Sequence, residues 1–96
     1  MTEQFENAGI GKAQIYPNPV TEYVFTIQFN ELNAGDYSLE LTDIMGRLLM
    51  KRKINIGFEQ QTEKVNINPG TRRGVYLVKL RDQGSKEIFT QKIIVQ

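Results

Sequence analysis

Residues 22–29, with the sequence EYVFTIQF, decide the fold class of this chain. Every second side chain is large and apolar, while β-branched or polar side chains stand between them. The four that share one face are Tyr23, Phe25, Ile27 and Phe29. A period of two over this length is typical of a strand with one face in a core and the other in water. We therefore predict a half-buried β-strand here.

Similar segments extend in both directions from this strand. The further predicted strands are residues 14–16, 37–43 (YSLELTD), 47–54 (RLLMKRKI), 62–67, 74–80 (GVYLVKL) and 87–95 (EIFTQKIIV). Turn residues separate them, notably Gly35, Pro69-Gly70 and Gly84. Seven strands with a turn about every ~8–12 residues predict an all-β, immunoglobulin-like antiparallel β-sandwich. No segment shows a helical period, and we find no internal repeat.

Residues 47–54 fit this pattern least well, because Leu48, Leu49 and Met50 are consecutive apolar residues. We expect a strand that is buried on one face and partly covered on the other. The neighbouring Arg47, Lys51, Arg52 and Lys53 form the only basic cluster. We interpret it as a solvated strand face or hairpin rather than as a phosphate- or lipid-binding site.

The composition excludes several classes of site. The 96 residues contain neither cysteine nor histidine, so no disulfide, thiolate or imidazole metal ligand or Ser–His–Asp triad can form. A net charge of +1 gives no basic excess of the kind that nucleic-acid binding requires. No apolar run approaches the ~20 residues of a membrane-spanning helix. We predict no enzyme, no cofactor and no metal.

The acidic residues Asp36, Glu40 and Asp43 are the nearest approach to a catalytic or calcium-binding cluster. Their spacing matches neither a carboxylate pair nor a calcium loop, so we interpret Asp36 and Asp43 as turn residues. Residues 1–11 (MTEQFENAGIG) are polar and lack the apolar core of a signal peptide. We expect them to be a lead-in or linker, the domain to span residues 12–96, and Met1 to begin an expressed fragment.

Two motifs have a physical interpretation. Pro17 and Pro19 lack backbone donors, so neither fits a central strand, and each restricts the residue before it, Tyr16 or Asn18. We expect a short strand that ends in a stiff, extended chain reversal. Near the start of the penultimate strand, Gly74 and Tyr76 stand where the tyrosine of an immunoglobulin-like corner returns its hydroxyl to the backbone.

Four elements occur in order along the chain: Ile15-Tyr16-Pro17-Asn18-Pro19, residues 41–47 with Asp43 and Gly46, Gly74-Val75-Tyr76, and the final Lys92-Ile93-Ile94-Val95-Gln96. Together they resemble the carboxyl-terminal sorting domain of type IX (Por) secretion system substrates of Bacteroidetes-type bacteria. One departure is Thr71 before Arg72-Arg73, where the family often has leucine.

The resemblance implies a folded export signal that directs a larger, amino-terminal cargo through an outer-membrane translocon. It also implies passage through the periplasm, and removal by a sortase-like cysteine peptidase upstream of the folded unit. We expect the partner to recognise residues 92–96 if the last strand lies at a sheet edge, through strand addition and capture of a terminal carboxylate.

Two other functions remain open: a structural immunoglobulin-like or fibronectin-like spacer of a surface protein, and a carbohydrate-binding β-sandwich. A carbohydrate-binding module needs exposed aromatic side chains on one sheet face, and most Tyr and Phe residues here fall on apolar faces. A spacer shares the fold, so only its position in a gene distinguishes it. The sequence names neither the cargo nor the cleavage position.

Overall fold

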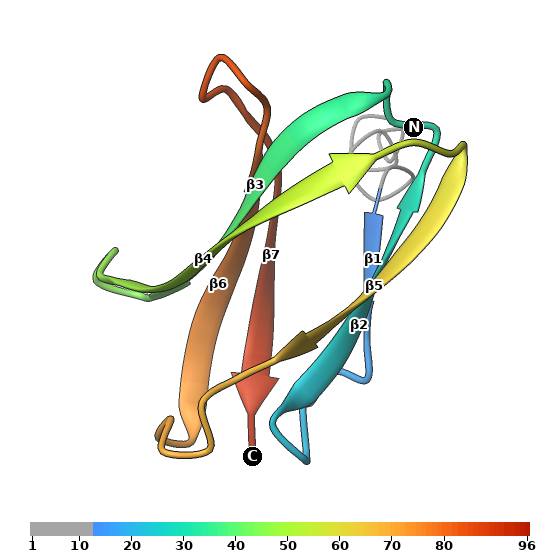
Figure 1. Cartoon of the computed structure of the whole chain (residues 1–96). Helices are drawn as coiled ribbons and strands as arrows, with labels where there is room; N and C mark the ends of the chain where they lie inside the picture. Colours follow the sequence, from blue (N-terminus) through green and yellow to red (C-terminus); the bar gives the residue numbers. More distant parts are fainter. Residues whose placement is uncertain (1–12) are drawn as a thin grey trace, which may run out of the picture.

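The computed structural model describes residues 13–96, which form two antiparallel sheets packed face to face (Figure 1). One sheet has the order β1-β2-β5 and the other the order β4-β3-β6-β7. The strands are β1 (Ala13–Tyr16), β2 (Val24–Asn30), β3 (Gly35–Asp43), β4 (Leu48–Ile56), β5 (Gln60–Asn66), β6 (Gly74–Arg81) and β7 (Glu87–Val95). The predicted seven-stranded sandwich is confirmed. The described residues include no helix that could span a membrane.

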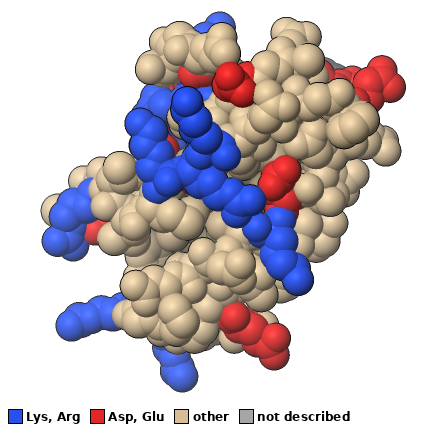
Figure 2. Space-filling view, viewed as in Figure 1, with Lys and Arg blue, Asp and Glu red and all other residues tan. Residues whose placement is uncertain are grey.

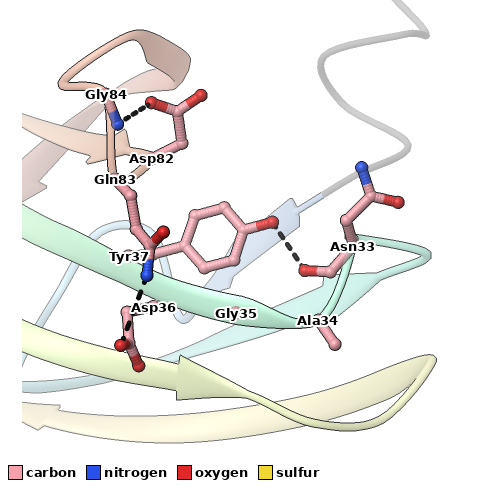
Figure 3. A pocket seen from close by; sticks show the side chains of 8 residues that line it. All are labelled: Asn33, Ala34, Gly35, Asp36, Tyr37, Asp82, Gln83 and Gly84. Carbon is pink, nitrogen blue, oxygen red and sulfur yellow. Dashed lines mark hydrogen bonds between the residues drawn. The ribbon is translucent and has the colours of Figure 1, made fainter.

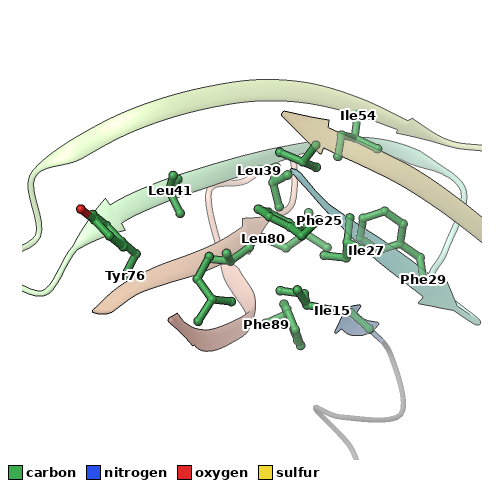
Figure 4. Packing of buried hydrophobic residues seen from close by; sticks show 14 of the residues in the cluster. Ile15, Phe25, Ile27, Phe29, Leu39, Leu41, Ile54, Tyr76, Leu80 and Phe89 are labelled. Carbon is green, nitrogen blue, oxygen red and sulfur yellow. The ribbon is translucent and has the colours of Figure 1, made fainter. Parts of the chain in front are cut away.

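Period-two patterning places the core between the sheets. In β2 the side chains of Phe25, Ile27 and Phe29 are buried, and in β3 those of Tyr37, Leu39 and Leu41 are buried. Figure 4 shows side chains of the two sheets meeting in this layer. The most deeply buried large side chains are Phe25, Phe29, Ile27, Leu39, Leu41, Ile56, Leu80 and Ile93.

The position of β4 distinguishes this sandwich from the constant-type immunoglobulin arrangement. In that arrangement the fourth strand belongs to the same sheet as the first, second and fifth strands. Here β4 pairs with β3, from Gly35 opposite Ile56 to Thr42 opposite Leu48. Arg52 of β4 links the two sheets at their edge, because its guanidinium donates to the Glu63 carboxylate at 3.0 Å and to the Lys64 carbonyl at 2.9 Å.

The expectation that the second face of β4 is partly covered was wrong, and the apolar run at the start of this strand is largely exposed. Leu48 and Leu49 are 53% and 51% exposed, whereas the buried residues of this strand are Ile54 and Ile56. Figure 1 shows why: the β3–β4 turn and the start of β4 extend beyond the opposing sheet, which ends before it can cover them. The basic cluster is divided as well, because Arg47 pairs with Asp43 while Arg52 binds β5.

The four-stranded sheet consists of two equivalent hairpins. The prediction that the chain has no internal repeat was therefore wrong. Residues 35–56 (β3 and β4) correspond to residues 74–95 (β6 and β7) at a constant offset of 39 positions. Each hairpin begins with Gly-x-Tyr, turns at an aspartate and ends with Lys-Ile-x-Ile or Lys-Ile-x-Val. Each has a register shift at the corresponding place, after Leu41 and after Leu80.

A pseudo-two-fold axis relates the hairpins through the β3–β6 pair. Thr42 lies opposite Leu77, and the equivalent pair is Ser38 opposite Arg81. Glu40 lies opposite Lys79, its own counterpart, so the axis passes between these two residues. The residues that are identical in the two hairpins are too few and too far apart to reveal the repeat. They occur mainly at the positions that form the turn, the corner and the core.

Candidate functional site

The last strand, β7, lies at an edge of the four-stranded sheet. Its side chains alternate: Ile93 and Val95 are in the core, whereas Lys92, Ile94 and Gln96 are exposed. The five residues predicted to carry recognition therefore divide into two buried anchors and three accessible side chains. Only the exposed three can contact a partner without unfolding the strand.

The outer edge of β7 is already occupied by the segment that contains the two prolines. The Val20 N–H donates to the Ile94 carbonyl at 2.7 Å, and the Gln96 N–H donates to the Val20 carbonyl at 2.9 Å. The Asn18 amide completes the contact, since its oxygen accepts from the Ile94 N–H at 3.1 Å and its nitrogen donates to the Lys92 carbonyl at 3.2 Å. The sequence led us to expect that a partner strand adds at residues 92–96. At Ile94 and Gln96 this is blocked, because the chain's own segment already forms these hydrogen bonds.

The proline segment is a bend rather than the extended crossing that we expected. Residues 17–19 are bent, and the peptide bonds Tyr16–Pro17 and Asn18–Pro19 are both cis. The segment leaves β1, which pairs with β2, and reaches β7 in the other sheet, where Val20 is fully buried. Tyr16, Pro17 and Pro19 are exposed beside this contact. The segment thus joins the two sheets at one edge of the sandwich.

The Asp43 motif forms a tight turn. The Asp43 carboxylate accepts hydrogen bonds at 2.9 Å from the backbone N–H groups of Met45 and Arg47, and at 2.7 Å from the Arg47 guanidinium. The N–H of Arg47, followed by the guanidinium and the Met45 N–H, lowers the pKa of Asp43. Gly46 has φ = +89°, which a side chain disfavours. Both motif residues therefore serve the turn.

The second hairpin repeats this turn with different residues. The Asp82 carboxylate accepts from the N–H groups of Gly84 and Lys86, each at 2.9 Å. Ser85 takes the place of Gly46 and has φ = +67°. The recurrence shows that aspartate at this position is an architectural requirement of each hairpin.

Tyr76 forms the corner that its position predicts. Its hydroxyl donates to the Arg72 carbonyl at 2.6 Å. Gly74, two residues earlier, has φ = +153°, so the corner needs glycine for its backbone even though a Cβ atom would meet no neighbour. The departure from the family pattern at Thr71 does not disrupt the corner.

A second corner was missed from the sequence. The Tyr37 hydroxyl donates to the Asn33 carbonyl at 2.6 Å, and Gly35 has φ = +146°. The shared spacing Gly-x-Tyr was the available signal. Burial, followed by the charge of Asp82, raises the pKa of the Tyr37 phenol.

The four motifs, which are separated in the sequence, meet at one end of the sheet. Asp43 lies opposite Tyr76, and Tyr76 lies opposite Ile93, so three motifs share a row across β3, β6 and β7. Asn18 adds the fourth motif at the next residue, Ile94. This assembly is the candidate site.

Two hollows occupy equivalent places under the pseudo-symmetry. Each lies between the Gly-x-Tyr corner of one hairpin and the aspartate turn of the other. The hollow beside Tyr37 has a volume of about 250 Å³, and Gln83 reaches across it to Asp36 at 3.4 Å (Figure 3). The hollow beside Tyr76 is larger, about 430 Å³, and is lined by Leu49, Val75 and residues 70–74.

Neither hollow is lined by a cluster of metal-ligating side chains. Across residues 13–96, no three His, Cys, Asp or Glu side chains are arranged to hold a metal ion. Asp36 and Asp82 line the smaller hollow, and Asp43 is engaged in its own turn. What the candidate site offers is a set of exposed side chains on a rigid support.

Comparison with known proteins identifies the family. The family described as "Secretion system C-terminal sorting domain" matches residues 14–96. A solved structure of PorZ, described as an essential bacterial surface component of the type IX secretion system of Porphyromonas gingivalis, superposes with a TM-score of 0.65 at 27% sequence identity. The alignment covers 93% of this chain and 12% of that protein. No curated protein matches the chain.

The family match spans all seven strands and the four motifs, and the structural match has the same all-β architecture. Membership of this family places the protein among exported proteins that interact with a secretion system. The chain belongs to the secretion system C-terminal sorting domain family and is a sorting signal for type IX secretion.

Proposed function

We propose that this domain directs an amino-terminal cargo protein through the outer-membrane translocon of the type IX system, and that the translocon recognises the exposed side chains of residues 92–96. The domain is in transit in the periplasm and is delivered with its cargo to the cell surface. A sortase-like cysteine peptidase then removes it by cleavage within or before residues 1–11. The domain itself has no catalytic role.

The observation that carries this proposal is the arrangement of the last strand. Lys92, Ile94 and Gln96 project from the sheet while Ile93 and Val95 hold the strand in the core. The backbone at Ile94 is bound by Asn18 and Val20, so a partner reads side chains on a fixed strand. A folded signal of this kind differs from a linear peptide signal, because its recognition depends on the sandwich remaining intact.

The spacer and carbohydrate-binding alternatives gain no support from the structure. Among residues 13–96 the exposed aromatic side chains are those of Tyr16 and Phe58, which lie near opposite ends of β2.

The test uses a reporter cargo fused in front of the whole chain, in a bacterium with a type IX system. The double variant Lys92→Glu, Ile94→Ser changes two exposed side chains and leaves the core intact. We expect the reporter to accumulate in the periplasm. The matched control is Lys53→Glu, Asn55→Ser, which changes the equivalent positions of the other hairpin and should leave delivery unchanged.

Circular dichroism and thermal unfolding of each purified chain establish that the variants are folded. Normal surface delivery of the folded Lys92→Glu, Ile94→Ser variant would show that these side chains are not the address. Deleting residues 92–96 also removes Ile93 and Val95 from the core. We expect the reporter with this deletion to stay in the periplasm, but the result tests recognition less specifically than the double variant does.

A further inference from the structure

The two equivalent hairpins present different surfaces at the two ends of the sheet. One end carries exposed apolar side chains, which we call the apolar end: Ile44, Met45, Leu48, Leu49, Val75 and Ile94. Ile44 and Met45 are 68% and 79% exposed at the tip of the projecting turn. Val75 and Ile94 lie opposite each other on β6 and β7.

Of the six positions related to the apolar end by the pseudo-two-fold axis, four are polar and one is glycine. The counterparts, in the same order, are Gln83, Gly84, Glu87, Ile88, Asp36 and Asn55. Among them Asn55 donates to Asp36 at 2.9 Å and Gln83 donates to Asp36 at 3.4 Å. Ile88, the one apolar counterpart, is partly buried against the core. This second end is thus closed by its own hydrogen bonds (Figure 3).

Comparison of the β3–β4 turn with the β6–β7 turn shows which residues the hairpin fold requires. Both turns have the same carboxylate-to-backbone hydrogen bonds, so the polar sequence supports the hairpin as well as the apolar one. Exposed leucine, isoleucine and methionine at the first turn therefore contribute nothing that the fold requires. A group of exposed apolar side chains that a fold does not require is typical of a docking site.

The charges around the apolar end indicate what occupies it. Arg72, Arg73 and Lys92 border it and are exposed, whereas the charges of Arg47 and Asp43 are paired with each other. A second copy of this chain would bring these cations against one another, which disfavours self-association. Figure 2 shows that Lys and Arg side chains also gather over the middle of the face on which β4 and β5 lie.

The hollow of about 430 Å³ favours a protein over a lipid surface as the occupant. It lies beside the projecting turn and is lined by Leu49, Val75 and residues 70–74. A recess of this size accepts individual side chains of a partner, while a flat bilayer surface would not enter it.

We propose that the apolar end docks a protein of the secretion machinery whose contact surface has apolar side chains bordered by carboxylates. This inference rests on the proposed function, and it adds the β3–β4 turn and the Tyr76 hollow to the recognition surface. The partner then reads two hairpins at once, the turn of the first and the last strand of the second. Truncating apolar anchors in such an interface weakens binding about tenfold or more.

The test exchanges the two ends. The variant Ile44→Gln, Met45→Gly, Leu48→Glu gives the first turn the residues that the fold already accommodates in the second turn. The reverse variant Gln83→Ile, Gly84→Met, Glu87→Leu is the control. With the reporter fusion, we expect the first variant to lower surface delivery about tenfold or more and the control to leave it unchanged.

Photocrosslinking identifies the class of partner independently of delivery. p-Benzoylphenylalanine in place of Met45 should crosslink to a protein of the cell envelope, and in place of Gly84 it should not. Crosslinking from Met45 should disappear when Leu48→Glu and Leu49→Ser are added. Equal crosslinking from both positions, or normal delivery of the folded first variant, overturns the proposal.

Two further measurements test the other occupants. Sedimentation of the purified chain with phosphatidylglycerol vesicles that depends on Ile44 and Met45 would assign the surface to lipid and overturn the proposal. A dimer in sedimentation velocity that the first variant abolishes would do the same in favour of self-association. Failure of the wild-type fusion to reach the surface would contradict the proposed function alone, because the crosslink from Met45 is scored separately.

Discussion

The Asn18 side-chain oxygen accepts a hydrogen bond from the backbone N–H of Ile94, 76 residues further along the chain, at 3.1 Å. The same amide donates to the Lys92 carbonyl at 3.2 Å. Through these two bonds the Tyr16–Pro19 motif acts as the neighbour that β7 would otherwise lack at its outer edge. The two terminal motifs of the family are thus halves of one structural unit.

Removing this amide should loosen the last strand. We expect Asn18→Ala to lower the free energy of unfolding by about 1 kcal/mol, since it loses two exposed hydrogen bonds of modest net value. Urea denaturation measures the loss, and amide hydrogen exchange should show faster exchange at Ile94. Asn66→Ala is the control, because that side chain is exposed and forms no hydrogen bond with residues 13–96. Equal effects of the two changes would contradict the bridging role of Asn18.

The two tyrosine corners should contribute similarly and independently. Tyr37→Phe and Tyr76→Phe each remove a hydroxyl that donates to a backbone carbonyl at 2.6 Å. We expect each to lower the free energy of unfolding by about 1–2 kcal/mol, because a partly buried carbonyl loses its partner. The hydroxyls share no partner, so the double variant should show the sum to within about 0.5 kcal/mol. A larger coupling in chemical denaturation would show that the corners are not separate.

The equivalent turn positions Gly46 and Ser85 allow a paired exchange. Both have positive φ, +89° and +67°. Gly46→Ser should lower the free energy of unfolding by about 1 kcal/mol, the cost of a left-handed side-chain residue. Ser85→Gly should raise it by about 0.5 kcal/mol, because relief of about 1–2 kcal/mol exceeds the entropic cost of glycine. Changes of the same sign in thermal denaturation would contradict the equivalence of the turns.

The lowered pKa of Asp43 predicts a contribution to acid unfolding. The N–H of Arg47 is the largest cause, and it stabilises the carboxylate only in the folded state. The contribution is therefore present above the unfolded pKa of about 4 and is lost as pH falls through the lower folded pKa. We expect the free energy of unfolding of Asp43→Asn to fall less steeply than that of wild type between about pH 4 and pH 2. Identical slopes in urea titrations at several pH values would exclude the contribution.

Thr42 is the buried polar residue with an unmet hydrogen-bonding group. Its side chain is 4% exposed, and its hydroxyl has no partner among the described residues. Thr42→Val keeps the shape and removes the hydroxyl, so it should raise the free energy of unfolding by about 1 kcal/mol. Thr62→Val, at an exposed position, should change it by less than about 0.5 kcal/mol. A destabilised Thr42→Val would show that the hydroxyl is satisfied in solution.

Much of the strand framework follows from the sequence, because each strand's own alternation records which of its faces meets the core. Phe25 and Ile27 of β2 and Leu39 and Leu41 of β3 were assigned correctly on this basis. The tyrosine corner at Tyr76 could be expected too, since it depends on glycine and tyrosine two residues apart. The four motifs, in their order along the chain, indicated the family.

What the sequence could not give is which strands become neighbours and what covers their edges. Leu48 and Leu49 are of a residue type that usually lies in the core, yet they are exposed because the turn extends past the opposing sheet. The repeat of the hairpins became visible only from their matching registers. The row of Asp43, Tyr76 and Ile93, with Asn18 beside it, depends on pairing between distant segments. Local periodicity determines which face of each strand is buried. Only the tertiary structure determines that the four motifs meet at one end of the sheet.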